Sequence, residues 1–114
     1  MAFTFYAKGV TTDSTANPVT LNQFTNTYSN LAVLCIMTTG GSRTGGAPSF
    51  AGFDMIQAGT TETSTEGSTE LWYSLNDRIP KSVGTSFSVP NTSSDNISII
   101  GSVYDTASTK WAEF

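Results

Sequence analysis

The chain has 114 residues, a net charge of −4 and only 12% charged side chains. This length fits one domain with one modest core, and the 11% aromatic content favours a folded chain over a disordered one. The few basic residues are scattered, which argues against nucleic-acid binding because phosphate contacts need clustered Lys and Arg. No apolar stretch is long enough to predict a membrane span, and the first residues lack the pattern of a secretory signal.

The surface of this chain is expected to be polar but largely uncharged, because Ser and Thr are abundant and charged residues are few. Charged residues are depleted where protein surfaces pack on each other, so a subunit enclosed by neighbours would have this composition. An ordinary Thr-rich β-sheet surface would have it as well. The composition alone leaves both interpretations open.

The first forty residues predict three strands. Residues 2–8 alternate between two sides, and residues 19–21 form a second extended piece after Pro18. Residues 31–37 are apolar in both alternating sets, which predicts a central strand covered on both faces, with a buried helix as the competing interpretation. Cys35 lies inside this run, so we expect it to be a small buried hydrophobic residue and not part of a disulfide.

A loop and a hairpin follow these strands. Residues 40–46 carry paired glycines at both ends, which predict a mobile loop in which Arg43 can adapt to a carboxylate of a partner. Ala51-Gly52 separates two short apolar pieces, the layout of a tight hairpin whose glycine has a positive φ. Residues 60–68 are polar and acidic, and we expect a hairpin connection or a sheet edge there.

Three further strands complete the series. Residues 71–75 have the strongest β-propensity and are expected to end at Asn76-Asp77, two residues that favour turns. Residues 84–89 and 95–104 alternate between apolar and polar positions, as half-buried strands do.

About eight short strands separated by turn residues predict a single antiparallel β-sandwich of jelly-roll or immunoglobulin-like type. We expect one domain over residues 1–114, with residues 1–8 and 106–114 as extended arms. No change in composition marks a linker or a second domain.

No catalytic, metal or cofactor site is predicted. The chain has no histidine, so the usual general base and the commonest metal ligand are missing. Glu62, Glu66 and Glu70 are close in sequence, but their neighbours are Thr, Ser and Gly, so we expect solvated charges and not a catalytic carboxylate pair. A weak calcium site at an Asp-Asn pair is an alternative that lacks the spaced acidic loop. We therefore expect a protein that is not an enzyme.

Exposed aromatic and apolar residues are the expected contact sites. If Leu71, Tyr73 and Leu75 face the core, alternation turns Trp72 outward. The same reasoning places Ile100 and Tyr104 of the last strand on the other side of the strand from its core-facing residues Ile97, Ile99 and Val103. If these residues stay exposed, they form an interface, because a large open apolar patch usually marks one. In the alternative interpretation, a second layer or the chain's own tail covers them. The predicted interface residues are Arg43, Trp72, Ile100, Tyr104, Trp111 and Phe114.

Three segments carry a family resemblance: residues 48–55 (PSFAGFDM), 67–75 (GSTELWYSL) and 95–97 (DNI). Together they resemble a β-sandwich module that recurs in virion structural proteins of tailed bacteriophages. In that module a short hairpin precedes an apolar strand centred on Leu-Trp-Tyr, and a Ser-rich closing strand returns beside it.

The resemblance implies a phage particle protein, and the short chain implies a small accessory subunit such as a capsid cement or decoration protein. Such a subunit would bind the major capsid protein or other virion proteins and form a homo-oligomer, with no cofactor, nucleic acid or membrane as partner. It would be made in the host cytoplasm and located in the virion. The alternatives are a phage tail or fibre component, and a carbohydrate-binding module that stacks sugars on Trp72, Tyr73 or Trp111.

Overall fold

The computed structural model describes residues 4–22, 29–79 and 86–105. No helix in this part of the chain is long and apolar enough to span a membrane. The described residues form ten strands, more than the sequence predicts, because the middle of the chain contributes several pieces of two or three residues. In chain order the strands are β1 Thr4–Ser14, β2 Val19–Leu21, β3 Ser29–Thr39, β4 Ser49–Phe50, β5 Phe53–Asp54, β6 Ile56–Gln57, β7 Glu62–Ser64, β8 Gly67–Ile79, β9 Phe87–Val89 and β10 Asn96–Asp105.

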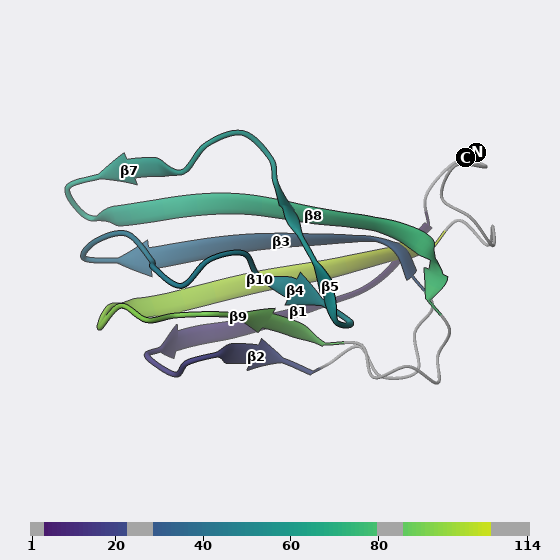
Figure 1. The fold of residues 1–114 in the computed structure, drawn as a ribbon, viewed down its shortest axis with the longest axis horizontal. Coiled ribbons are helices and arrows are strands. Elements are labelled where there is room, and N and C mark those ends of the chain that lie inside the picture. The colour runs from purple at the N-terminus through teal and green to yellow at the C-terminus, as the bar shows by residue number, and fades with distance from the viewer. Residues whose placement is uncertain (1–3, 23–28, 80–85, 106–114) are drawn as a thin grey trace.

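The strands form two antiparallel sheets that pack on each other (Figure 1). The large sheet has six strands in the order β1-β10-β3-β8-β6, and β7 also pairs with β8. The small sheet has four strands in the order β2-β9-β4-β5 and lies over one face of the large sheet. This arrangement confirms the predicted antiparallel β-sandwich. Residues 4–8, expected as a strand or an arm, are part of β1 and pair with β10.

The hydrophobic core lies between the two sheets. Phe50 and Phe87 of the small sheet are fully buried, and their ring centroids are 4.6 Å apart. Every other residue of β10 faces this core, as the alternation predicts. The buried apolar residues are Val19, Leu21, Ala32, Leu34, Ile36, Phe50, Met55, Phe87, Val89, Ile97, Ile99 and Val103.

Gly101 of β10 lies directly under the Phe87 ring. A Cβ atom at this position would be 2.5 Å from Cε2 of Phe87, closer than side-chain carbons approach in proteins. The ring therefore occupies the space that any side chain of residue 101 would need. This contact explains why a glycine stands between Ile99 and Val103 in the inner row of β10.

The hairpin predicted at Ala51-Gly52 is confirmed. Its strands β4 and β5 pair through Phe50 and Phe53. Ala51 and Gly52 have φ values of 52° and 83°. Two successive positive φ values are typical of a type I′ turn, whose twist matches that of the flanking strands.

β8 is longer than the sequence predicts. Asn76 and Asp77 favour turns, yet the strand continues to Ile79, which pairs with Ser29 of β3. The pairing with β3 is irregular here, because the register shifts between Ser29 and Leu31 and no residue of β3 lies in register with residues 76–78. The turn-favouring Asn76 and Asp77 therefore lie in an irregular stretch inside the strand and do not end it.

β3 is central in the large sheet, as predicted, but the described residues cover only one of its faces. Leu34 and Ile36 are fully buried, whereas Met37 is 37% exposed and Cys35 is half-buried. The small sheet covers the inner face alone, and the part of the chain that the structure describes places no layer on the other face. The predicted burial of both faces, and with it the full burial of Cys35, is wrong.

The two faces of β3 predict opposite outcomes for neighbouring substitutions. Leu34→Asp should prevent folding, because an unpaired buried carboxylate costs several kcal/mol out of a total stability of about 5 to 15 kcal/mol. Val33→Asp, whose side chain is on the less buried side, should melt cooperatively within a few degrees of wild type. Circular dichroism during heating measures both. Unfolding of both variants would show that a further layer covers the second face.

Candidate functional site

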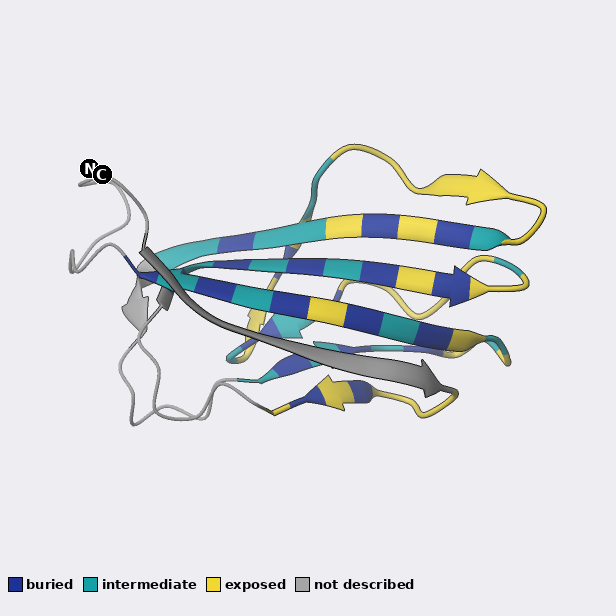
Figure 2. Ribbon diagram, turned by 180° about the vertical axis from the view of Figure 1, so that it is seen from behind, coloured by how far each residue is buried: buried dark blue, intermediate teal, exposed yellow. Residues whose placement is uncertain are grey.

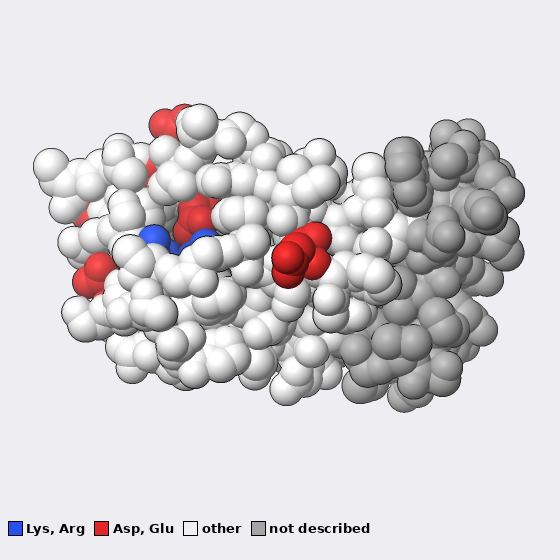
Figure 3. Space-filling model, viewed as in Figure 1, with Lys and Arg blue, Asp and Glu red and all other residues white. Residues whose placement is uncertain are grey.

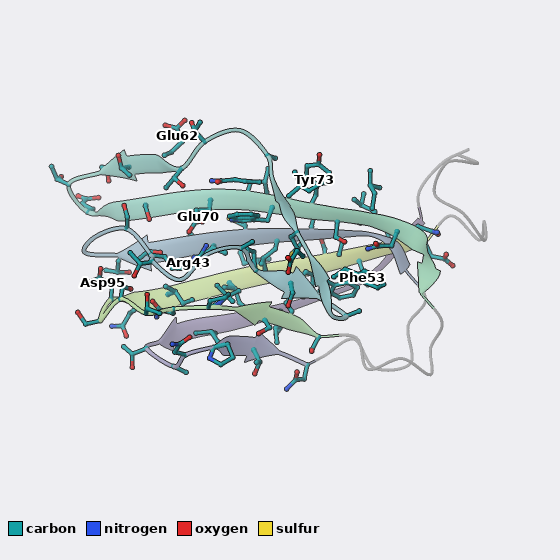
Figure 4. All side chains as sticks on the ribbon, in the orientation of Figure 1. Arg43, Phe53, Glu62, Glu70, Tyr73 and Asp95 are labelled. Atoms are coloured by element: carbon teal, nitrogen blue, oxygen red, sulfur yellow. The ribbon has the colours of Figure 1, made fainter. Side chains whose placement is uncertain are left out.

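A buried ion pair links the loop after β3 to β8, between the two sheets (Figure 4). Nε of Arg43 donates to Oε2 of Glu70 at 3.0 Å, and Nη2 donates to Oε1 at 2.9 Å. Only 3% of the Arg43 side chain and 6% of the Glu70 side chain are exposed. Figure 3 shows basic and acidic atoms side by side in a recess of this face. Two parallel charge-assisted hydrogen bonds make this a strong and strictly oriented contact.

Further hydrogen bonds complete the cluster. Nη1 of Arg43 donates to the carbonyl oxygens of Gly46 at 2.8 Å and Pro90 at 2.7 Å. Nε1 of Trp72 donates to Oε1 of Glu70 at 3.1 Å. Burying two charges is costly unless their remaining donors and acceptors are also engaged, and these contacts engage all three guanidinium nitrogens and both carboxylate oxygens. Arg43, Glu70 and Trp72 together form what we call the inner cluster.

The loop over residues 40–46 is tied to the segment that precedes β10. Gly45 has a φ of 132°, and a Cβ atom there would be 2.9 Å from the carbonyl oxygen of Pro90. Thr92 N donates to the carbonyl oxygen of Thr44 at 2.8 Å, and the two threonine hydroxyls also share a hydrogen bond of 2.8 Å. Gly45 therefore allows close packing, and the expectation that Arg43 binds a carboxylate of a partner is wrong. The carboxylate that Arg43 binds belongs to this chain.

The three glutamates of the acidic region have different environments. Glu62 and Glu66 are exposed, as predicted, but only 5% of Glu70 is exposed, so the expectation of a solvated charge is wrong for this residue. Both carboxylate oxygens of Glu70 already accept hydrogen bonds from the inner cluster. In this arrangement the carboxylate serves to hold the loop on β8.

The inner cluster also decides which side of β8 faces the core. Trp72 packs against the core, whereas Leu71 is 45% exposed, so the predicted outward position of Trp72 is wrong. Glu70 and Ser74 share the side of Trp72 and are buried with it. Because Arg43 neutralises Glu70 inside the sandwich, the more apolar set of β8 is turned to the outside.

The outside of the large sheet carries apolar and hydroxyl side chains over its three central strands, and none of the described ones is charged. Several of these positions are exposed (Figure 2). Among the described residues, four of the five exposed large hydrophobic side chains lie here, and only Phe53 lies on the small sheet. We call this surface the outer face. It comprises Leu31, Val33, Cys35 and Met37 of β3, Ile56 of β6, Thr69, Leu71, Tyr73 and Leu75 of β8, and Ser98, Ile100, Ser102 and Tyr104 of β10.

The predicted interface residues divide into three groups. Ile100 and Tyr104 lie on the outer face, and Ile100 is 41% exposed. Arg43 and Trp72 lie in the inner cluster and are not offered to a partner in this arrangement. The tail residues of the set, Trp111 and Phe114, lie outside the described residues. The sequence reasoning missed Leu71 and Met37. Alternation from a core-facing Leu34 identifies Met37, whereas Leu71 follows only from the inward position of Glu70, which the structure reveals.

Cys35 lies at the middle of the outer face. It pairs in register with Ile100 on one side and Leu71 on the other, so the three form one row across the sheet. Burial raises the pKa of the Cys35 thiol above its ordinary value, because the thiolate is poorly solvated there. A raised pKa lowers the reactive thiolate fraction at neutral pH.

An open depression of about 310 Å³ lies at the β7–β8 hairpin. Its lining combines the exposed Glu62 and Glu66 with hydroxyl groups, among them those of Thr38 and Ser68, which are buried and make no hydrogen bond in the structure. Within the described ranges, no three acidic, cysteine or histidine side chains gather as a metal site would require. The depression therefore offers polar contacts without a recognisable ligand set.

Comparisons with known proteins identify no relative. No protein-family model, curated protein or solved structure matches the chain. A functional assignment must therefore rest on the geometry of the inner cluster and the outer face.

The inner cluster predicts unequal effects for three similar substitutions. Glu70→Gln should lower the free energy of unfolding by about 3 kcal/mol, because it leaves the buried Arg43 guanidinium without its counter-charge. Glu62→Gln and Glu66→Gln are matched controls and should stay within about 0.5 kcal/mol of wild type. Urea denaturation measures all three. Equal stability of the three variants would contradict a structural role for the ion pair.

A double substitution separates the charge from the packing. Arg43→Met alone leaves Glu70 buried without a partner and should be strongly destabilising. Arg43→Met combined with Glu70→Leu removes both charges and should recover a large part of the lost stability. Additive losses in the double variant would show that the two side chains act independently.

Proposed function

We propose that this chain is a non-enzymatic structural subunit of a phage particle, of the capsid cement or decoration kind. The observation that carries the proposal is the outer face, where large apolar side chains are exposed and no described side chain is charged. Apolar patches of this kind on a soluble domain mark association surfaces. The resemblance of residues 48–104 to a virion β-sandwich module supports the choice of particle.

The mechanism would be mass action. A protein that binds an assembled shell but not its separated subunits stabilises the shell by the free energy of binding. Such a role needs contact area and a rigid scaffold, and no reacting group. The inner cluster fits this requirement, because its charged groups are engaged with each other and hold the loop on the sheet.

A carbohydrate-binding role through Trp72 is less well supported. Sugar stacking needs an aromatic ring whose face is open to solvent. Trp72 instead packs against the core, and its Nε1 atom donates to Glu70 at 3.1 Å. Tyr73, on the outer face, is the aromatic residue of this strand that remains available for a contact.

The direct test is to look for the protein in the particle. Quantitative mass spectrometry of purified virions from the source should detect the chain in a fixed copy number, and the purified protein should co-sediment with empty heads to a saturating ratio. Absence from the virion together with no co-sedimentation would refute the proposal.

Variants of the outer face refine this test. Leu71→Lys and Ile100→Lys should each weaken head binding by about tenfold or more, because each places a charge in an apolar contact. Phe53→Lys is the matched control, since Phe53 is 50% exposed but lies on the small sheet. Melting curves identify any loss of fold. If the control weakens binding and the outer-face variants do not, the association surface is on the small sheet.

A further inference from the structure

We infer that the outer face packs against the outer face of a second copy of this chain. The inference rests on the proposed function and refines it: the outer face is the contact between two copies of the subunit, and head binding requires that pair. Leu71 and Ile100 are 45% and 41% exposed in the single chain, and Met37 is 37% exposed. A second sheet laid on this face would remove all three from water.

The absence of charge favours a neutral partner. None of the described outer-face side chains on β3, β8 and β10 is charged, and Glu62, on the same side, belongs to the edge strand β7. A charged partner surface would have to lose its hydration here without gaining a counter-charge. Among the described outer-face residues of β3, β8 and β10, two copies would therefore bring no like charges together, although each chain has a net charge of −4.

The shape and area also fit a second copy. Two sheets with the same twist pack face to face about 10 Å apart, with their strands rotated by about 30°. At about 3.3 Å per residue and 4.8 Å per strand, the strip formed by β10, β3 and the facing part of β8 has an area of roughly 500 Å². Two such strips bury about 1,000 Å², which is the lower limit for a specific interface.

The arrangement of the strands makes the face self-complementary. β10 and β8 flank β3 on its two sides, so a two-fold axis along β3 places Ile100 of one copy against Leu71 of the other. Cys35, in the same row, lies next to this axis and opposite Cys35 of the second copy. The single cysteine of the chain is therefore a probe for the centre of the proposed contact.

The experiment combines sedimentation with thiol labelling, using the isolated protein. As the protein concentration rises from low to high micromolar, sedimentation should change from monomer to dimer. The rate at which a bulky maleimide labels Cys35 should fall by about tenfold or more over the same range, because only the monomer exposes the thiol. The raised pKa of Cys35 slows labelling at every concentration and does not produce this dependence.

Two variants and a control make the assignment specific. Leu71→Lys and the milder Ile100→Ser should remain monomeric, with a labelling rate that does not depend on concentration. Phe53→Lys should form the dimer as wild type does, because its side chain is on the small sheet. Melting curves are measured for each, and retention of the fold in either outer-face variant is sufficient for the comparison.

Two results would overturn the inference. The first is a monomer at all concentrations whose Cys35 is labelled rapidly, which would mean that no second copy covers the face. The second is slow labelling of Cys35 at all concentrations in the full chain, with rapid labelling once the chain is truncated after Thr109. This result would mean that the chain's own tail covers the outer face.

These outcomes are distinct from failure of the proposed function. A monomeric protein that still co-sediments with heads would overturn the second copy as partner and leave the particle role intact. A dimer that is absent from virions and does not bind heads would leave the second copy as the partner of the outer face and overturn the particle role.

Discussion

The bidentate contact between Arg43 and Glu70 is the interaction on which the arrangement of β8 depends. It brings a carboxylate into the space between two sheets, where an unpaired charge could not be kept. Because successive side chains of a strand point to opposite sides, an inward Glu70 also turns Trp72 inward and Leu71 outward. The same guanidinium binds the carbonyl oxygen of Pro90 and so connects β8 to the segment before β10.

This one contact has consequences on both sides of the large sheet. On the inner side it joins the core and fixes a glycine-containing loop at one end of the sandwich. On the outer side it leaves a row of apolar residues without cover in the described part of the chain. A buried and hydrogen-bonded ion pair inside the sandwich thus accompanies apolar groups that are exposed to water outside. The proposed association surface therefore results from the orientation of β8, which turns Glu70 and Trp72 inward and Leu71 outward.

Much of the fold can be predicted from the sequence, because its signals are local. The alternation of β10, the type I′ hairpin at Ala51-Gly52 and the central position of β3 all depend on short-range patterns. The sides of β8 cannot be predicted in this way, because Leu71 and Trp72 are both apolar and the deciding partner of Glu70 is 27 residues away. The sequence likewise predicts that Arg43 binds a carboxylate of a partner, but Gly45 permits a close approach to Pro90 that only the tertiary structure reveals, and Arg43 binds Glu70 of this chain. Both errors at the candidate site arise from long-range contacts.

The orientation of β8 determines what both faces of the large sheet present, and cysteine accessibility measures it directly. Two variants in a Cys35→Ser background, Leu71→Cys and Ser74→Cys, place one thiol on each side of the strand. Ser74 is 4% exposed, and cysteine is close to serine in size. In dilute native protein we expect rapid labelling at position 71, and labelling at position 74 only after denaturant is added. Rapid labelling at position 74 with protection at position 71 would show that β8 faces the core with its other side, and would contradict the role assigned to the ion pair.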